Sequence, residues 1–339
     1  MEDFKEPESH PDPPTQRPEQ VRFDQVRRAV DLLLSEAANI FVGQNAFLRL
    51  VLVSLFAGGH VLIESVPGLG KTLLVRILGV ALGCRFNRIQ FTADMMPSDV
   101  TGQPVFNPQT NDFRFRPGPV FTHILLADEI NRAPAKTHAA LLEIMQEGRV
   151  SVDGTTHQIE PPFLVLATQN PLESEGTYSL PEAQLDRFLF KLVVDYPTHA
   201  EENDILRLHC RPQHVEQQVV NAIRPLLNPE KVLAVQNICR GVHVDDRIIN
   251  YVSEIVRSTR DWPALAAGAS PRAGIALVTA ARVLAAFDGR GYVIPDDVQE
   301  LVLPAIRHRV VLTPEAEVAG ETVDGCLAAI LESVEVPRL

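Results

Sequence analysis

Strand-like and helical segments alternate along the first part of the chain. The clearest strand is His123–Ala127, which is apolar after its first residue, as expected of a parallel strand covered on both faces. Helical spacing of apolar residues over Asn45–Ala57 and Ala135–Glu147 predicts helices between the strands. This alternation is typical of an α/β fold with a parallel sheet. The predicted strands are His60–Glu64, Arg85–Phe91, His123–Ala127, Phe163–Thr168 and Phe190–Val194.

Two segments between these strands have the pattern of β-hairpins. Apolar and polar residues alternate over Ser98–Arg116 around a polar turn at Asn107–Asp112. A second alternating segment, Arg149–Ile159, contains Asp-Gly at its centre, a dipeptide that favours tight hairpin turns. We therefore expect two hairpin insertions in the sheet domain.

Strand signals end near Pro197, and helical patterns fill the rest of the chain. The predicted helices are Glu201–Cys210, Pro229–Cys239, Asp245–Thr259, Pro271–Phe287, Pro295–Arg307 and Thr313–Leu331. At the other end, Met1 to about Gln20 is rich in Pro and Glu and lacks apolar periodicity, which predicts a disordered tail. The predicted organisation is a tail over 1–20, an α/β core over 21–197, a linker region over 198–225 and an all-helical domain over 226–339.

Composition narrows the classes of function. The net charge of −12 argues against a constitutive nucleic-acid binder, which needs a basic patch to neutralise phosphates. The four cysteines are far apart and the ten histidines lack ligand spacing, so we expect reduced thiols, a cytoplasmic location and no protein-bound transition metal. An apolar run of membrane-spanning length is absent from the sequence.

The segment from Ser65 to Thr72 has the composition of a phosphate-binding loop. It follows an apolar strand, contains Pro67, Gly68 and Gly70, and opens a helical pattern at Lys71-Thr72. Backbone N–H groups at such a helix start bind phosphate, the lysine reaches the β- and γ-phosphates, and the hydroxyl of Thr72 is a ligand for Mg²⁺. Ser65 departs from the usual pattern, which has glycine at this position.

Two carboxylates follow the buried strand at His123–Ala127. Asp128 at the strand end is suited to hold the water shell of Mg²⁺, and Glu129 to act as general base towards an attacking water. The alternative is a strand end capped by solvated carboxylates. The position of the pair after a phosphate loop, within an α/β pattern, favours the catalytic reading.

Three further polar residues are candidates for contact with the nucleotide. Asn170 ends the next predicted strand and can hydrogen-bond the water or the γ-phosphate; the alternative is a turn Asn before Pro171. Arg187 lies at the end of a predicted helix, Pro181–Phe188, where it can stabilise charge on a γ-phosphate or form a surface ion pair with its neighbour Asp186. Arg272 follows Ser-Pro at a helix start and either reaches phosphate or is an ordinary exposed Arg.

These residues, in this order, resemble the AAA+ ATPases, and more closely the MoxR family. The resemblance covers about Phe41 to Val310. The stretches that carry it are Val66–Thr72, Phe115–Phe121, Ala127–Ala133, Ala167–Pro171 and Leu180–Phe188.

The resemblance implies a role for each motif. Asp128-Glu129 would be Walker B, Asn170 sensor 1, Arg187 an arginine finger acting on the neighbouring subunit, and Arg272 sensor 2. The hairpin at Ser98–Arg116 would be the helix-2 insert, and the helical domain the lid. The implied Walker A and nucleotide-binding residues are Val42, Gly43 and Gln44 beside the adenine, then Ser65, Pro67, Gly68, Leu69, Gly70, Lys71, Thr72 and Leu73.

The expected function is that of a Mg²⁺-dependent ATPase that assembles as a hexameric ring and remodels partner proteins. The resemblance implies von Willebrand factor A domain proteins as clients. Two alternatives remain: a nucleic-acid motor, which needs basic hairpin tips, and an ATP-switched scaffold without hydrolysis. The tips at Asn107–Asp112 and Asp153–His157 are not rich in Lys or Arg, and the presence of Glu129 and Asn170 argues against the scaffold.

Overall fold

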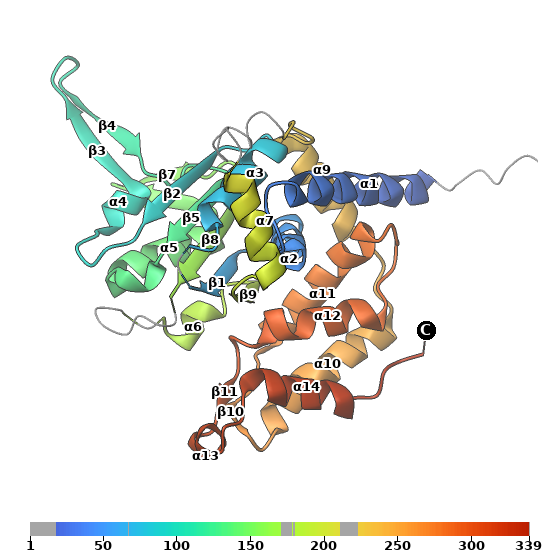
Figure 1. Ribbon diagram of the computed structural model, residues 1–339. Coiled ribbons are helices and arrows are strands. Elements are labelled where there is room, and N and C mark those ends of the chain that lie inside the picture. Colours follow the sequence, from blue (N-terminus) through green and yellow to red (C-terminus); the bar gives the residue numbers. More distant parts are fainter. Residues whose placement is uncertain (1–17, 67, 171–177, 179, 211–222, 339) are drawn as a thin grey trace, which may run out of the picture.

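The computed structural model describes residues 18–66, 68–170, 178, 180–210 and 223–338. Figure 1 shows a sheet with helices around it, a hairpin that projects away from it at upper left, and a helical lid below. The predicted tail lies outside the described residues, apart from its last three. These begin helix α1 (Pro18–Ala38), so the helix starts three residues before the predicted boundary. Proline suits such a start because its fixed φ matches the first helical turn.

The central sheet has five parallel strands in the order β2-β5-β8-β1-β9. Each predicted strand is confirmed to within one or two residues. The carboxyl ends of β1, β8 and β5 are neighbours in this order, so the phosphate loop lies beside the strand ends that carry Asp128 and Asn170. The strands are β1 (Val61–Ser65), β2 (Phe86–Gln90), β5 (Ile124–Asp128), β8 (Leu164–Gln169) and β9 (Phe190–Val194).

Alternate side chains of the sheet enter two separate apolar cores. On strand β5, Ile124 and Leu126 belong to a core shared with α2, α3 and the lid, whereas Leu125 and Ala127 belong to a core shared with α5. Both faces of the sheet are therefore buried, which explains the continuous apolar runs in the sequence. The helices of this part, besides α1, are α2 (Asn45–Ala57), α3 (Lys71–Ala81), α4 (Pro97–Thr101), α5 (Ala135–Glu147), α6 (Glu182–Leu185) and α7 (His199–His209), with a 3₁₀ turn η1 (Ile130–Arg132).

Two antiparallel hairpins stand apart from the central sheet, as predicted. They are β3 (Gly102–Asn107) with β4 (Asp112–Pro117), and β6 (Arg149–Val152) with β7 (Thr155–Gln158). Near the base of the first hairpin, Phe115 stacks on His157 of the second, with ring centroids 3.9 Å apart. At its tip, Phe106 and Phe113 form an exposed aromatic pair with centroids 5.4 Å apart. The two insertions therefore contact each other at the base, and the first leaves an apolar tip in solvent.

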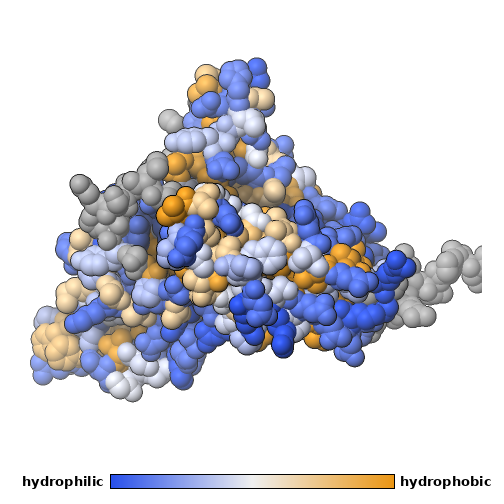
Figure 2. Space-filling model, turned by 90° about the horizontal axis from the view of Figure 1, so that it is seen from below, coloured by the Kyte–Doolittle hydropathy of each residue, from blue (hydrophilic) through white to orange (hydrophobic). Residues whose placement is uncertain are grey.

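The lid is built around helix α11, which packs against α9, α10 and α12 and also against the N-terminal helices α1 and α2. Its helices are α9 (Pro229–Arg240), α10 (Asp246–Asp261), α11 (Pro271–Phe287), α12 (Pro295–Ile306), α13 (Pro314–Val318) and α14 (Val323–Ser333). A short antiparallel pair, β10 (Leu265–Ala267) with β11 (Val311–Leu312), was not predicted by the helical patterns. Figure 2 looks at the molecule from below and shows hydrophilic residues around smaller apolar patches.

Two predicted helices differ from the observed ones. The segment Thr313–Leu331 forms two helices, because the chain turns between them at Gly320, whose φ is +80°. The segment Pro181–Phe188 is helical only over Glu182–Leu185, after which it enters β9. The predicted linker 198–225 includes α7, and its residues 211–222 lie outside the described part. Within the described ranges, helices of the length and apolarity that a membrane crossing requires are absent.

Candidate functional site

The phosphate loop joins β1 to α3 through backbone conformations that favour glycine. Gly68 and Gly70 have φ of +88° and +76°, and Gly70 directly precedes the first residue of α3. Among the described residues, no side-chain hydrogen bond caps this helix start, where the first N–H groups have no partner within the helix itself. Ser65 is 3 % exposed at the end of β1, and its Oγ has no partner among the described residues. Pro67 lies outside the described residues.

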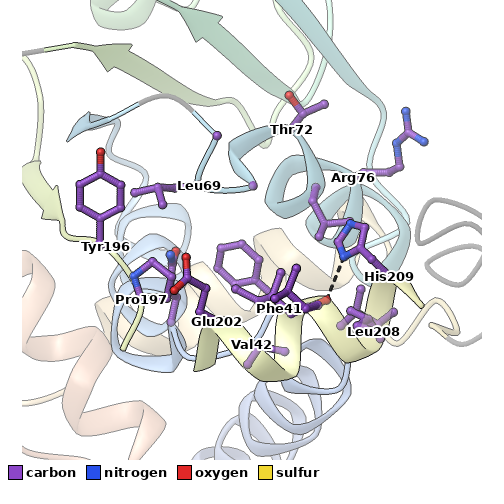
Figure 3. Close-up of a pocket in the computed structure, with 17 residues that line it drawn as sticks. Phe41, Val42, Leu69, Thr72, Arg76, Tyr196, Pro197, Glu202, Leu208 and His209 are labelled. Atoms are coloured by element: carbon purple, nitrogen blue, oxygen red, sulfur yellow. Dashed lines mark hydrogen bonds between the residues drawn. The ribbon is translucent and has the colours of Figure 1, made fainter. Parts of the chain in front are cut away.

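A pocket of about 600 Å³ opens beside this loop. Figure 3 shows Phe41 and Val42 approaching it from the segment before α2, Leu69 and Thr72 from the loop, and Tyr196 from the segment after β9. The pocket therefore has apolar and aromatic walls with several polar side chains among them, the character of a small-molecule site. Its other lining residues are Ile40, Gln44, Gly68, Gly70, Leu73, Arg76, Pro197, Glu202, Ile205, Leu206, Leu208 and His209.

The segment predicted to border the adenine contributes to this pocket. Val42 and Gln44 line it, and Gly43 between them has a φ of +80°. A Cβ on Gly43 would lie 2.5 Å from the carboxylate of Glu201, so α7 closes tightly on this turn. The sequence predicted a helix at Glu201–Cys210, close to α7, but it did not indicate that this helix and Tyr196 line the pocket.

Asp128 is held at the end of β5 by two neighbours. Thr168 donates from its hydroxyl to Oδ1 of Asp128 (2.7 Å), and Arg88 forms an ion pair of 2.7 Å with Oδ2. The same Thr168 hydroxyl accepts the backbone N–H of Glu129 (2.9 Å). The register of the sheet therefore aligns the two predicted carboxylates through a threonine that sequence reasoning treated only as a strand residue.

Glu129 has a left-handed backbone conformation with φ of +56°, which is uncommon for a residue with a side chain. Its Oε2 accepts from Nε2 of Gln90 (2.7 Å) and pairs with Nε of Arg132 at 2.9 Å. Strained backbone of this kind is enriched at functional sites. Gln90 is the exposed last residue of β2, and the sequence did not indicate its contact with Glu129.

The predicted phosphate lysine lies in the field of both carboxylates. Burial lowers the pKa of Lys71, while the charges of Asp128 and Glu129 oppose that shift and the charge of Arg88 adds to it. The charges that act on Lys71 therefore come from residues at the carboxyl end of β5 and from Arg88 of β2. Asn170 follows β8 at the same edge and is 7 % exposed.

The two predicted arginines lie elsewhere, and neither lines the 600 Å³ pocket. Arg187 is exposed, donates to the carbonyl of Leu142 (2.9 Å) and borders a separate hollow of about 360 Å³ beside α5. Arg272 is in the first turn of α11, as predicted from Ser270, whose hydroxyl accepts its N–H (3.2 Å). Its guanidinium lies 3.6 Å from Asp186. The structure therefore gathers the loop and the carboxylates, and leaves both arginines outside that group.

The donor groups at the sheet edge suit Mg²⁺ bound together with a nucleotide. Thr72 and Asp128 offer oxygen ligands, which this hard cation prefers, and Mg²⁺ commonly keeps few protein ligands beside substrate phosphates. Within the described ranges, groups of three or more His, Cys, Asp and Glu arranged to hold a metal by themselves are absent. The residues present therefore suit Mg²⁺ that binds together with the phosphates of a nucleotide.

Two family models match this chain. Residues 60–190 match the ATPase family associated with various cellular activities (AAA), and residues 257–328 match the AAA lid domain. The first range begins one residue before β1 and ends at the start of β9, so it contains the sheet edge described above. Nucleotide binding is a property of that family.

Relatives extend the similarity over nearly the whole chain. The uncharacterised protein YeaC of Bacillus subtilis (strain 168) is 48 % identical over 88 % of this chain and 92 % of its own length. Chaperone MoxR1 of Mycobacterium tuberculosis (strain ATCC 25618 / H37Rv) is 43 % identical over 90 % of this chain and 81 % of its own. A crystal structure of a candidate ATPase from Cytophaga hutchinsonii superposes with a TM-score of 0.87 at 36 % identity, covering 94 % of this chain and 98 % of the other. With its phosphate loop, paired carboxylates and helical lid, the chain belongs to the MoxR family of AAA+ ATPases.

Proposed function

We propose that this protein hydrolyses ATP with Mg²⁺ in a homo-oligomeric ring and uses the cycle to remodel partner proteins. The observation that carries the proposal is the convergence of Lys71, Asp128 and Glu129 at one edge of the sheet, beside a pocket large enough for a nucleoside. A cytoplasmic location remains a prediction from the sequence.

Each residue of the edge has a separate role in this proposal. The N–H groups at the start of α3 bind the phosphates, and Lys71 contacts the β- and γ-phosphates. Thr72 and Asp128 hold Mg²⁺, which when bound neutralises charge on the phosphate oxygens. Val42 and Gln44 lie where the base enters, with Gly43 and Leu73 beside it.

Glu129 is the proposed general base and Asn170 the proposed partner of the attacking water. In the structure, the Glu129 carboxylate is engaged by Gln90 and Arg132. Both contacts are made to Oε2, and the second oxygen of the carboxylate, Oε1, is the proposed acceptor of the proton from water.

A ring is supported by the position of Arg187. An arginine that stabilises the γ-phosphate is worth roughly 10³–10⁵ in rate in related nucleotide hydrolases. Arg187 is exposed and does not line the pocket of its own chain. It is therefore proposed to contact the γ-phosphate bound by a neighbouring subunit. We propose a hexamer, in which Arg187 acts on the next subunit and Arg272 on its own nucleotide.

Protein clients are supported by the hairpin β3–β4. Its apolar face carries Phe106 and Phe113 at the tip, 46 % and 72 % exposed, although large aromatic side chains are usually buried. Chaperone MoxR1 provides the precedent for a chaperone function among relatives. We propose that this tip contacts clients, and that von Willebrand factor A domain proteins are among them.

The test is the substitution Glu129→Gln. We expect phosphate release to fall by roughly 10²–10⁴-fold, because a general base contributes about that factor, while binding of labelled ATP persists. Glu254→Gln on the exposed face of α10 is the matched control and should turn over at the wild-type rate. Wild-type turnover by Glu129→Gln would show that the base has been assigned to the wrong residue.

A further inference from the structure

A single carboxylate of the sheet domain receives several groups of the lid. Asp186 lies between α6 and β9, directly before Arg187. Arg309 donates from Nε to its Oδ1 (2.7 Å), and the hydroxyl of Ser270 donates to its Oδ2 (3.3 Å). The guanidinium of Arg272 lies 3.6 Å from the same Oδ2. Side chains from the start of α11 and from the segment after α12 therefore meet at one acidic group of the core.

The contact with Arg309 is buried and is reinforced by the backbone. The side chain of Arg309 is 4 % exposed and donates to the carbonyls of Phe188 (2.7 Å), Asp186 (3.3 Å) and Leu189 (3.4 Å). The neighbouring His308 also contacts the carbonyl of Phe188, at 3.1 Å. Burial lowers the pKa of Arg309, and the charge of Asp186 opposes that shift. The segment that carries Arg187 is therefore fixed to the lid by main-chain contacts on both sides of that residue.

The contact with Arg272 is of a different kind. Its side chain is 58 % exposed and its distance to Asp186 is about 1 Å longer than that of Arg309. Exposed ion pairs contribute little to stability, so this one is easily exchanged for a stronger anion. Arg309 is the permanent partner of Asp186, and Arg272 is the replaceable one.

We propose that Asp186 is a positioning residue that couples the two arginines: it fixes the segment of Arg187 to the lid and holds Arg272 until a nucleotide phosphate takes its place. This inference rests on the proposed function, in which Arg272 serves its own site and Arg187 the next. When Arg272 moves from Asp186 to a phosphate, Asp186 loses a positively charged neighbour. This changes the electrostatic environment of the adjacent Arg187. Occupancy of one site is then transmitted to the arginine that serves its neighbour.

The test compares affinity with turnover in full-length Asp186→Asn. Because Arg272 loses its competing carboxylate, we expect labelled ATP to bind two- to five-fold more tightly, measured in a Glu129→Gln background. Because Arg187 loses its fixed support, kcat in the otherwise wild-type chain should fall about tenfold and the Hill coefficient for ATP should approach one. Adding Arg272→Ala should abolish the gain in affinity. A merely structural role would lower affinity and turnover together.

Two further variants complete the test. Ser270→Asp keeps a good helix cap but places a second carboxylate beside Asp186, so it should retain Arg272 and weaken ATP binding several-fold. It also decides the question if Asp186→Asn does not fold. Asp324→Asn breaks an ion pair of the same type within the lid, between Arg307 and Asp324 (2.7 Å), and should leave affinity and turnover unchanged.

The coupling is overturned if Asp186→Asn hydrolyses ATP at the wild-type rate or binds ATP more weakly than the wild type. It is also overturned if Ser270→Asp binds ATP with unchanged affinity. In these cases the wild-type and Asp324→Asn proteins still hydrolyse ATP, and the proposed function stands. Absence of hydrolysis in the wild type overturns the proposed function itself, and the coupling with it.

Discussion

The hydroxyl of Thr168 bridges the two carboxylate residues at the end of the neighbouring strand. It donates to Oδ1 of Asp128 at 2.7 Å and accepts the backbone N–H of Glu129 at 2.9 Å. One oxygen thus sets the orientation of the proposed Mg²⁺ ligand and the backbone position of the proposed base. Their geometry depends on the register between β5 and β8 as much as on their own side chains.

Thr168→Val keeps the shape of this side chain but removes both hydrogen bonds. We expect ATP turnover to fall about 10- to 100-fold through misplacement of the carboxylates, and the free energy of unfolding to fall by roughly 1–3 kcal/mol because the N–H of Glu129 stays buried without an acceptor. Phosphate release and urea unfolding measure the two effects. Thr168→Ser retains the hydroxyl and should recover most of the turnover; equal turnover in both variants would contradict the prediction.

We expect Arg187→Ala to bind ATP normally. Its rate of ATP hydrolysis should fall by roughly 10³-fold or more, since charge on the γ-phosphate is no longer stabilised. Mixing it with Lys71→Ala subunits should restore part of the activity, because an intact Arg187 then faces an intact loop at some interfaces. Phosphate release from mixed samples, with assembly checked by sizing, measures this. The exposed Arg240→Ala is the control. Failure of mixed rings to recover activity would count against a shared site.

The lid contains a buried ion pair whose loss should be costly. Arg290 contacts Asp297 at 2.6 Å, Asp297 is 5 % exposed, and its Oδ2 also accepts the N–H of Ile294 (2.9 Å). Asp297→Ala leaves Arg290 paired with Asp288 (2.9 Å) and removes the acceptor of the Ile294 N–H, so it should destabilise the fold by roughly 1–3 kcal/mol. Urea unfolding followed by circular dichroism measures the loss. Asp112→Ala on the exposed hairpin should leave the midpoint unchanged.

The burial of His60 predicts that the folded protein is less stable in mild acid. His60 accepts the N–H of Val165 (3.1 Å) and its other ring nitrogen contacts the carbonyl of Met145 (3.0 Å), so the neutral ring is fixed in place. Burial lowers its pKa to about 4. The unfolded chain binds a proton near pH 6.5 and the folded chain does not, so stability falls as pH falls from 6.5 to 4.

Between pH 6.5 and 5 this single histidine should contribute roughly 2 kcal/mol of the loss. The measurement is the urea midpoint at both pH values in the wild type and in His60→Gln, whose side chain does not titrate. The variant should be less stable at pH 7 but lose less on acidification. An unchanged difference between the two pH values would show that another group carries the effect; His308, whose pKa burial lowers to about 3, is the next one to replace.

The apolar hairpin tip gives the prediction about clients. Replacing both Phe106 and Phe113 by Ser should leave the melting temperature and basal turnover unchanged, because the two rings are exposed and the β3–β4 hairpin projects away from the central sheet (Figure 1). In a Glu129→Gln background held in ATP, the double variant should recover fewer client proteins than Glu129→Gln alone. Equal recovery would place client contact elsewhere on the molecule.

The sequence was sufficient to predict the sheet and the glycine-containing loop that follows β1, because apolar runs and loop glycines are local signals. Strand β9 was predicted with the observed bounds, and the loop, Asp128 and Glu129 meet as expected. What it could not supply are contacts between distant segments. Thr168 reaches Asp128 only through strand register, and Arg309 reaches Asp186 across 123 positions of the chain.

Other differences have local causes. Tyr196 and α7 line the pocket, but the apolar periodicity that predicted this helix does not show which surface the helix faces. The last predicted helix is split in two because Gly320 has a positive φ. Apolar residues follow a helical pattern on both sides of Gly320, so the pattern predicts one continuous helix.

The strands β3 and β4 pair only with each other in the described sheets. Their length and tip residues can therefore change without altering the register of the five central strands. Substitutions at the tip are then largely free of the constraints that hold Lys71 and Asp128 in place. Within one AAA+ scaffold, this separation lets natural selection vary the proposed recognition surface while the proposed site of hydrolysis is preserved.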